Sequence, residues 1–186
     1  MNRTQDTRFT ASDWSAYAHD YDSLLALRPY QQMLADVAHK IPIDAKHILD
    51  VACGTGNLLT ALPTELRDRT VYLGGDYAQV MLERAQSKFP RQTFTRVDLN
   101  ATLPFPDDLF DTIVSINTLY ALRDPQRGRA ACAGRSSGSG AGWVSLMSPT
   151  FPAQAQRPGA KALARLRCRS SSARRGCWPD PRPGCG

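Results

Sequence analysis

One short segment constrains the fold of this chain more than any other: the apolar run Ile48–Ala52 leads directly into the glycine-containing loop Cys53–Asn57. The run is continuous rather than alternating, which is typical of a strand covered on both faces, as in parallel sheets. Glycines at 54 and 56 allow a sharp turn and close approach of a ligand, and a following helix offers free N–H groups. The segment therefore predicts a strand, a ligand-binding turn and a helix.

The alternation of strand and helix continues along the chain. Strands are expected where apolar residues run together, and helices where apolar residues recur at spacings of three and four. Strands that alternate with helices form βαβ units and a parallel sheet. We therefore expect an α/β fold, a Rossmann-like parallel sheet with helices on both faces, incomplete at its C-terminal end. The expected strands are 71–76, 93–97 and 110–116, and the expected helices are 58–66 and 80–88.

Two further helices are expected before the glycine loop. The first follows from the spacing of apolar residues between Trp14 and Leu27, with Asp20 and Asp22 toward its exposed side. The second, Tyr30–His39, begins after Pro29. These N-terminal helices over 10–39 and a nucleotide-binding core over 40–124 would together make one domain over 1–127.

The composition changes abruptly after residue 127. Of the 59 residues in 128–186, 42 are Ala, Arg, Gly, Ser or Pro, a composition that buries too little apolar surface to offset chain entropy. We expect this tail to be largely disordered, with one strand over 143–147. The tail has a net charge of +9, whereas residues 1–127 have −3. A uniform nucleic-acid-binding surface is therefore not expected, although a nucleic-acid-associated function through the tail stays open as an alternative.

The glycine loop distinguishes between two kinds of nucleotide cofactor. A dinucleotide-binding fingerprint requires a third glycine for helix packing, where this chain has Leu59. Asp50 stands at the strand end four residues before Gly54, where a carboxylate would repel a pyrophosphate and attract an ammonium or sulfonium group. The electrostatics favour a cofactor that carries a cationic amino acid over NAD.

The segments ILDVACGTGN, LGGDYAQVMLERA and VDLNATLPFPDDLFDTIVSINTL together resemble class I S-adenosylmethionine-dependent methyltransferases. The resemblance covers roughly residues 14–124 and is to the small-molecule branch that includes ubiquinone and menaquinone methyltransferases. It implies S-adenosyl-L-methionine as the cofactor and a small-molecule methyl acceptor. The resemblance ends after residue 124, and the tail composition is that of a high-GC gene read out of frame, so we expect a truncated or frameshifted methyltransferase.

The resemblance also assigns cofactor-binding roles to individual residues. Gly54 and Gly56 would approach the methionine portion of the cofactor, and Asp50 would support the loop and the ammonium group. Asp76 would accept hydrogen bonds from both ribose hydroxyls. The remaining positions would contact the adenine, the methyl donor or the outer face of the cofactor. They are Tyr77 and Met81 beside the adenine, Asp98 and the Leu99 main chain at its edge, Asn117 near the methyl group, and Tyr17 and Tyr21 closing over the cofactor.

Several alternatives stay open at this point. Asp98 and Asn117 also fit structural turns, because Asp and Asn are common where strands end, and Tyr17 and Tyr21 also fit ordinary helix packing. No catalytic residue is assigned, since methyl transfer can depend largely on positioning, and the chain could be a cofactor-binding remnant without activity. No metal site, signal segment or membrane span is legible, which favours a cytoplasmic protein. The oligomeric state is not indicated.

Overall fold

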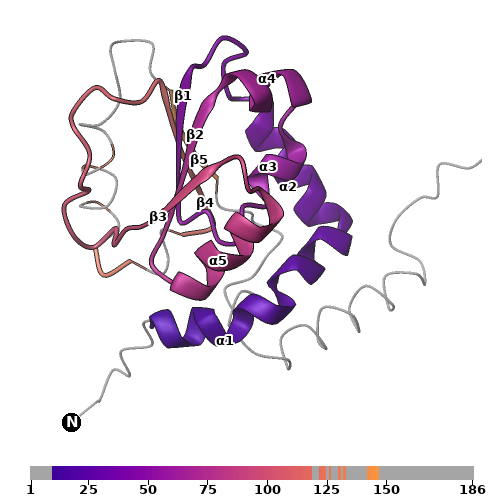
Figure 1. Ribbon diagram of the computed structural model, residues 1–186, viewed down its shortest axis with the longest axis vertical. Coiled ribbons are helices and arrows are strands. Elements are labelled where there is room, and N and C mark those ends of the chain that lie inside the picture. The colour runs from indigo at the N-terminus through magenta and orange to yellow at the C-terminus, as the bar shows by residue number, and fades with distance from the viewer. Residues whose placement is uncertain are drawn as a thin grey trace, which may run out of the picture. The chain divides into compact units, whose positions relative to one another are not determined.

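The computed structural model describes residues 10–118, 122–124, 126, 130, 132 and 142–146. Five strands form one sheet in the order β3-β2-β1-β4-β5, and every neighbouring pair is parallel (Figure 1). The expected α/β parallel sheet is thereby confirmed, with β1 at its centre. The strands are β1 (His47–Val51), β2 (Val71–Asp76), β3 (Thr93–Arg96), β4 (Thr112–Ile116) and β5 (Gly142–Leu146).

The described helices precede or connect the first three strands. Figure 1 shows α2, α3 and α4 together on one side of the sheet. Gln126, Ala130 and Cys132 also have helical backbone. The helices are α1 (Ala11–Tyr21), the 3₁₀-helix η1 (Asp22–Ala26), α2 (Arg28–Ala38), α3 (Leu58–Ala61), α4 (Thr64–Arg69) and α5 (Gln79–Lys88).

Two prolines explain where the helix boundaries differ from those expected. Pro63 divides the helix expected over 58–66 into α3 and α4, because proline lacks the N–H that a continuing helix needs. Pro29 has the opposite effect, since it lies in the first turn of α2, where its missing N–H costs nothing. The helix therefore begins at Arg28 rather than after the proline.

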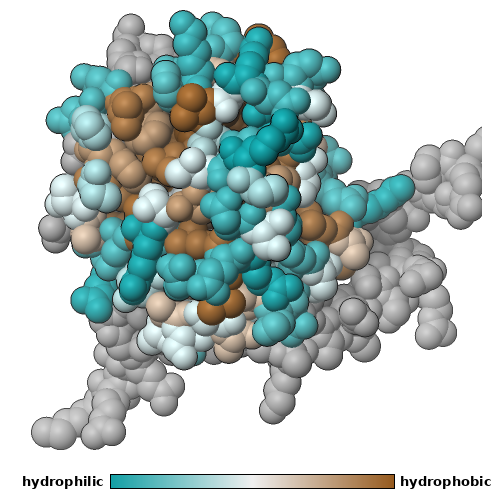
Figure 2. Space-filling model, in the orientation of Figure 1, coloured by the Kyte–Doolittle hydropathy of each residue, from teal (hydrophilic) through white to brown (hydrophobic). Residues whose placement is uncertain are grey.

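The sheet is covered on both faces by apolar residues. On the α2 side, Val37, Leu59 and Leu66 pack with Ile48 and Tyr72, and Phe89 after α5 joins the same cluster. The opposite cluster includes Leu49, Ile113, Val97, Phe110 and Cys132. In Figure 2, hydrophilic residues cover much of the helical side, and hydrophobic residues come into view on the other side of the sheet. Burial on both faces is what the continuous apolar pattern of β1 predicts.

The later part of the chain is described only in places. β5 overlaps the strand expected over 143–147, while the expected disorder and the basic charge of the tail concern residues outside those that the structure describes. Among the described residues, the helices are all too short or too polar to cross a membrane.

Candidate cofactor-binding site

The glycine loop joins the carboxyl end of β1 to α3 and adopts left-handed backbone conformations. Ala52, Gly54 and Gly56 have φ values of 60°, 55° and 76°. Such values cost an L-residue roughly 1–2 kcal/mol but are easily adopted by glycine. The Cys53 N–H donates to the carbonyl of Gly75 at 3.1 Å, so the loop remains attached to the end of β2. The turn is thus held beside the adjacent strand end.

Asp76, the last residue of β2, is bound directly to this loop. Its carboxylate accepts the Gly54 N–H at 2.9 Å through Oδ2 and the Ala78 N–H at 2.9 Å through Oδ1. Burial raises the pKa of Asp76, although the N–H groups that donate to it act in the opposite direction. These two hydrogen bonds fix the orientation of the Asp76 carboxylate, and the residue is partly exposed.

Asp50, near the carboxyl end of β1, is level with Gly74 of β2 and is more deeply buried than Asp76. It is 2% exposed, and its Oδ2 accepts the hydroxyl of Tyr72 at 2.7 Å. Burial raises the pKa of Asp50 to about 7, and the hydrogen bond from Tyr72 reduces that rise. The thiol of Cys53 is also buried, and burial raises its pKa. The Asp50 side chain is therefore joined to the neighbouring strand β2.

The residues expected beside the adenine follow directly after Asp76. Tyr77 is 42% exposed, and the guanidinium of Arg96 lies 5.2 Å from the centre of its ring. Met81 is buried with Ala18 and Ala78, where α1 meets α5. An exposed ring thus precedes α5, and a buried thioether lies in the first turn of that helix.

The other expected contacts have structural partners of their own. The carboxylate of Asp98 accepts both the backbone N–H of Asn100 at 2.8 Å and its side-chain amide at 3.0 Å. The side chain of Leu99 packs in the core on the side of the sheet away from α2. Asn117 has a left-handed φ of 52° and its Nδ2 lies 3.4 Å from Sδ of Met33 in α2. These residues lie at the carboxyl ends of β3 and β4.

Aromatic residues of α1 lie over the glycine loop. A Cβ placed on Gly54 would come within 3.0 Å of Cε1 of Tyr21, so this ring sits directly against the turn. Tyr17 packs edge-on against Tyr21, with ring centres 5.6 Å apart. Tyr17 is buried, and its hydroxyl has no hydrogen-bond partner among the described residues. A buried hydroxyl of this kind is expected to find a partner, and a bound ligand would supply one.

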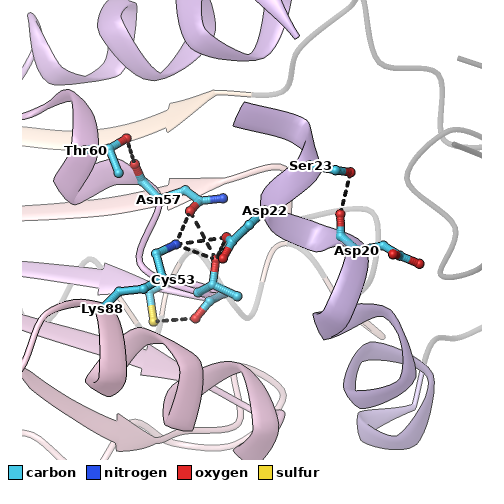
Figure 3. Close-up of polar contacts among 9 residues, drawn as sticks. Asp20, Asp22, Ser23, Cys53, Asn57, Thr60 and Lys88 are labelled. Atoms are coloured by element: carbon cyan, nitrogen blue, oxygen red, sulfur yellow. Dashed lines mark hydrogen bonds and ion pairs between the residues drawn. The ribbon is translucent and has the colours of Figure 1, made fainter. Parts of the chain in front are cut away.

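A polar cluster that the sequence did not indicate lies beside the loop. Nζ of Lys88 lies 2.9 Å from Asp22 Oδ1, 2.7 Å from Asn57 Oδ1 and 3.3 Å from Thr55 Oγ1 (Figure 3). The expectation that Asp22 is on the exposed side of its helix is therefore wrong, because the helix ends at Tyr21 and Asp22 turns toward Lys88. Local spacing carries no signal for a pair this far apart in sequence.

Together these residues suit a ligand with a ribose and a small charged end. A carboxylate held by backbone N–H groups can accept ribose hydroxyls, and the loop lets a ligand approach the main chain. The described residues contain no group of His, Cys, Asp and Glu that could hold a metal ion.

Comparison with known proteins shows what this chain is similar to. Residues 48–134 match the family described as Methyltransferase domain. The chain is 33% identical over 101 residues to trans-aconitate 2-methyltransferase of Acidovorax ebreus, covering 50% of this chain and 38% of that protein. It is 34% identical over 110 residues to the ubiquinone/menaquinone biosynthesis C-methyltransferase UbiE of Rickettsia rickettsii, covering 53% and 44%. The chain thus spans about two fifths of the length of these curated relatives.

A solved structure agrees in fold. A protein from Methanococcus maripaludis, assigned as an S-adenosyl-L-methionine-dependent methyltransferase, aligns with a TM-score of 0.63 and 15% identity, covering 94% of this chain and 78% of that one. The site described above lies within or beside the residues that match the family. Residues 48–134 thus match a methyltransferase domain, and the chain shares the fold of this solved structure.

Proposed function

We propose that this chain binds S-adenosylmethionine at the carboxyl ends of β1 and β2 and transfers its methyl group to a small-molecule acceptor. The observation that carries the proposal is the Asp76 carboxylate, which is oriented by the N–H groups of Gly54 and Ala78 at the edge of the glycine loop. Membership in the methyltransferase domain family supports the choice of cofactor.

The residues present fit this cofactor. Asp76 would accept the ribose hydroxyls, and Gly54 and Gly56 would leave room for the methionine portion against the main chain. Tyr77 would cover one side of the adenine, with Met81 beneath it. When bound, S-adenosylmethionine supplies an electrophilic methyl group on its sulfonium. The rings of Tyr17 and Tyr21 would exclude water from this part of the site, and the hydroxyl of Tyr17 would gain a partner.

Residues other than those at the cofactor would bind the methyl acceptor. Methyl transfer requires in-line approach of the acceptor, so positioning contributes much of the rate without a dedicated acid or base. Trans-aconitate and demethylmenaquinone are named for related methyltransferases, which makes carboxylates and quinols the first acceptors to test. Asn117, held by Met33 of α2, would lie at the mouth of the acceptor side. If acceptor residues are missing, the chain would hold the cofactor without turnover.

Calorimetry with S-adenosylhomocysteine on the full chain tests the cofactor assignment. We expect the unsubstituted chain to bind and Asp76→Ala to weaken binding at least 100-fold, because two hydrogen bonds to a charged acceptor contribute roughly 1.5–3 kcal/mol each. Asp68→Ala is the matched control, since Asp68 pairs with Arg91 on an exposed part of α4. Unchanged affinity in Asp76→Ala, or binding of NADH in its place, would contradict the proposal.

A further inference from the structure

The ammonium group of Lys88 joins parts of the molecule that are far apart in sequence. Lys88 is the last residue of α5, and its Nζ is surrounded by three acceptor oxygens at 2.7 to 3.3 Å. An ammonium group has three N–H donors, so its hydrogen-bonding capacity is fully used. Figure 3 shows Lys88 directed toward Asn57 and Asp22, which come from different segments.

Two of these acceptors belong to the glycine loop itself. Thr55 stands between Gly54 and Gly56 and is fully buried, and Asn57, which ends the loop, is 2% exposed. The Thr55 hydroxyl also donates to Asp22 Oδ1 at 2.5 Å. Because the ion-paired side chains of Lys88 and Asp22 are only 27% and 29% exposed, their interaction is partly shielded from solvent.

The third acceptor, Asp22, connects this cluster to the N-terminal helices. Asp22 follows Tyr21, whose ring lies against Gly54. The side chain of Asp22 therefore fixes the backbone position from which the Tyr21 ring reaches the loop. A second polar contact joins α5 to the N-terminal helices: Nη1 of Arg84 in α5 lies 3.1 Å from Nδ1 of His19 in α1, on the exposed surface.

We propose that Lys88 and Asp22 form a latch that holds the N-terminal helices over the glycine loop and so sets the affinity for the methyl donor. Lys88 acts as a positioning residue: it touches Thr55, Asn57 and Asp22, and acts on the donor through the loop and the Tyr21 ring. This inference rests on the proposed function for the identity of the ligand. The latch itself is a contact between α5, the loop and η1.

The test combines hydrogen exchange without ligand and calorimetry with S-adenosylhomocysteine on the full chain. In Lys88→Met we expect faster exchange over 11–26, unchanged exchange over β1, β2 and β4, and an affinity reduced about tenfold. Arg91→Met is the matched control, because the Arg91 side chain is 81% exposed and its ion pair within the described part of the chain is with Asp68. It should leave both measurements unchanged.

Asp22→Asn provides a second variant that keeps the size of the side chain. If the two residues form one latch, combining Asp22→Asn with Lys88→Met should weaken binding little more than Lys88→Met alone. Full additivity, unchanged affinity in Lys88→Met, or loss of protection spread evenly over the strands would overturn the latch. Absence of binding by the unsubstituted chain would overturn the proposed function instead, and exchange over 11–26 would then decide whether Lys88 tethers the helices.

Discussion

The two ends of the central parallel strands are built in different ways. At their carboxyl ends lie the left-handed residues Ala52, Gly54 and Asn117, together with the buried carboxylate of Asp50. At their amino ends Asp111 accepts hydrogen bonds from the N–H groups of Lys46 and His47, and Asp108, four residues before β4, has a left-handed φ of 57°. Most of the left-handed residues and the buried carboxyl group thus lie at one end of the sheet.

The amino end of the strands carries structural hydrogen bonds and exposed apolar residues. The Thr70 hydroxyl donates to the carbonyl of Ala45 at 3.1 Å, which closes the turn before β2. Ile43 and Val71 are exposed there, at 66% and 62%. Since strained backbone and buried charges persist only where the surrounding structure holds them, the contrast supports the carboxyl end of the sheet as the place of the proposed cofactor site.

The largest expected effect concerns the buried charge of Asp50. Its pKa in the folded protein is about 7, above the ordinary value of 3.8, so the fold favours the protonated carboxyl. The stabilisation from Asp50 is therefore present below pH 4 and is lost as the pH rises toward 7. Asp50→Asn removes this pH dependence. The unfolding free energy of the variant minus that of the unsubstituted chain should therefore rise between pH 4 and pH 8, by roughly 4 kcal/mol at most.

Urea unfolding of both proteins across this pH range measures the difference directly. Asparagine keeps an oxygen that can accept the Tyr72 hydroxyl, so the packing of β1 against β2 is preserved. If the unfolding free energies of the two proteins change with pH in the same way between pH 4 and 8, the pKa of Asp50 is not raised by burial and the comparison between the two ends loses this residue.

A smaller effect is expected from strain in the glycine loop. Gly54→Ala places a Cβ on a residue with φ of 55° and brings it within 3.0 Å of the Tyr21 ring. We expect a loss of roughly 1–2 kcal/mol in stability and a reduction of about tenfold in S-adenosylhomocysteine affinity. Asp108→Ala, at another left-handed position with φ of 57°, is the control and should leave the affinity unchanged. If Gly54→Ala and Asp108→Ala lose affinity equally, the glycine loop does not contact the ligand in the way proposed.

The smallest effect belongs to the amino end. Partial burial alone would raise the pKa of Asp111, but the N–H groups of His47 and Lys46 outweigh it, so the pKa lies below its usual value. The stabilisation from Asp111 is therefore present above pH 4 and is lost as the pH falls further, opposite to that from Asp50. Asp111→Ala should lower the unfolding free energy by no more than about 1 kcal/mol, because the carboxylate is partly solvated.

Thermal unfolding at pH 7 measures this loss of stability, and calorimetry measures the affinity for S-adenosylhomocysteine. S-adenosylhomocysteine should bind Asp111→Ala as tightly as the unsubstituted chain. A large loss of affinity would mean that the two ends of the strands are coupled.

The parallel fold could be predicted from the sequence because its signals are local. The apolar run of β1 precedes the glycines directly, and β2 ends at Asp76, as expected from the run over 71–76. Pro63 was also a local signal for a break in the helix after the loop. The expectation of one helix over 58–66 gave more weight to the spacing of its apolar residues, and the structure shows that the proline decides. Site contacts such as Tyr72 with Asp50 and Lys88 with Asp22 join residues 22 and 66 positions apart, and no short-range pattern encodes them.

The strand order also has a consequence for how the domain folds. In the registers of the sheet, His47 pairs with Val71 and Leu73 with Thr93, whereas Ile48 pairs with Thr112. The first two pairings close much shorter loops than the third, and closing a shorter loop costs less chain entropy. The β1–β2–β3 half should therefore assemble before β4 joins. Since this half carries the glycine loop and Asp76, the proposed donor side of the site should form early, and the proposed acceptor side, with Asn117 after β4, should depend on the slower, long-range pairing.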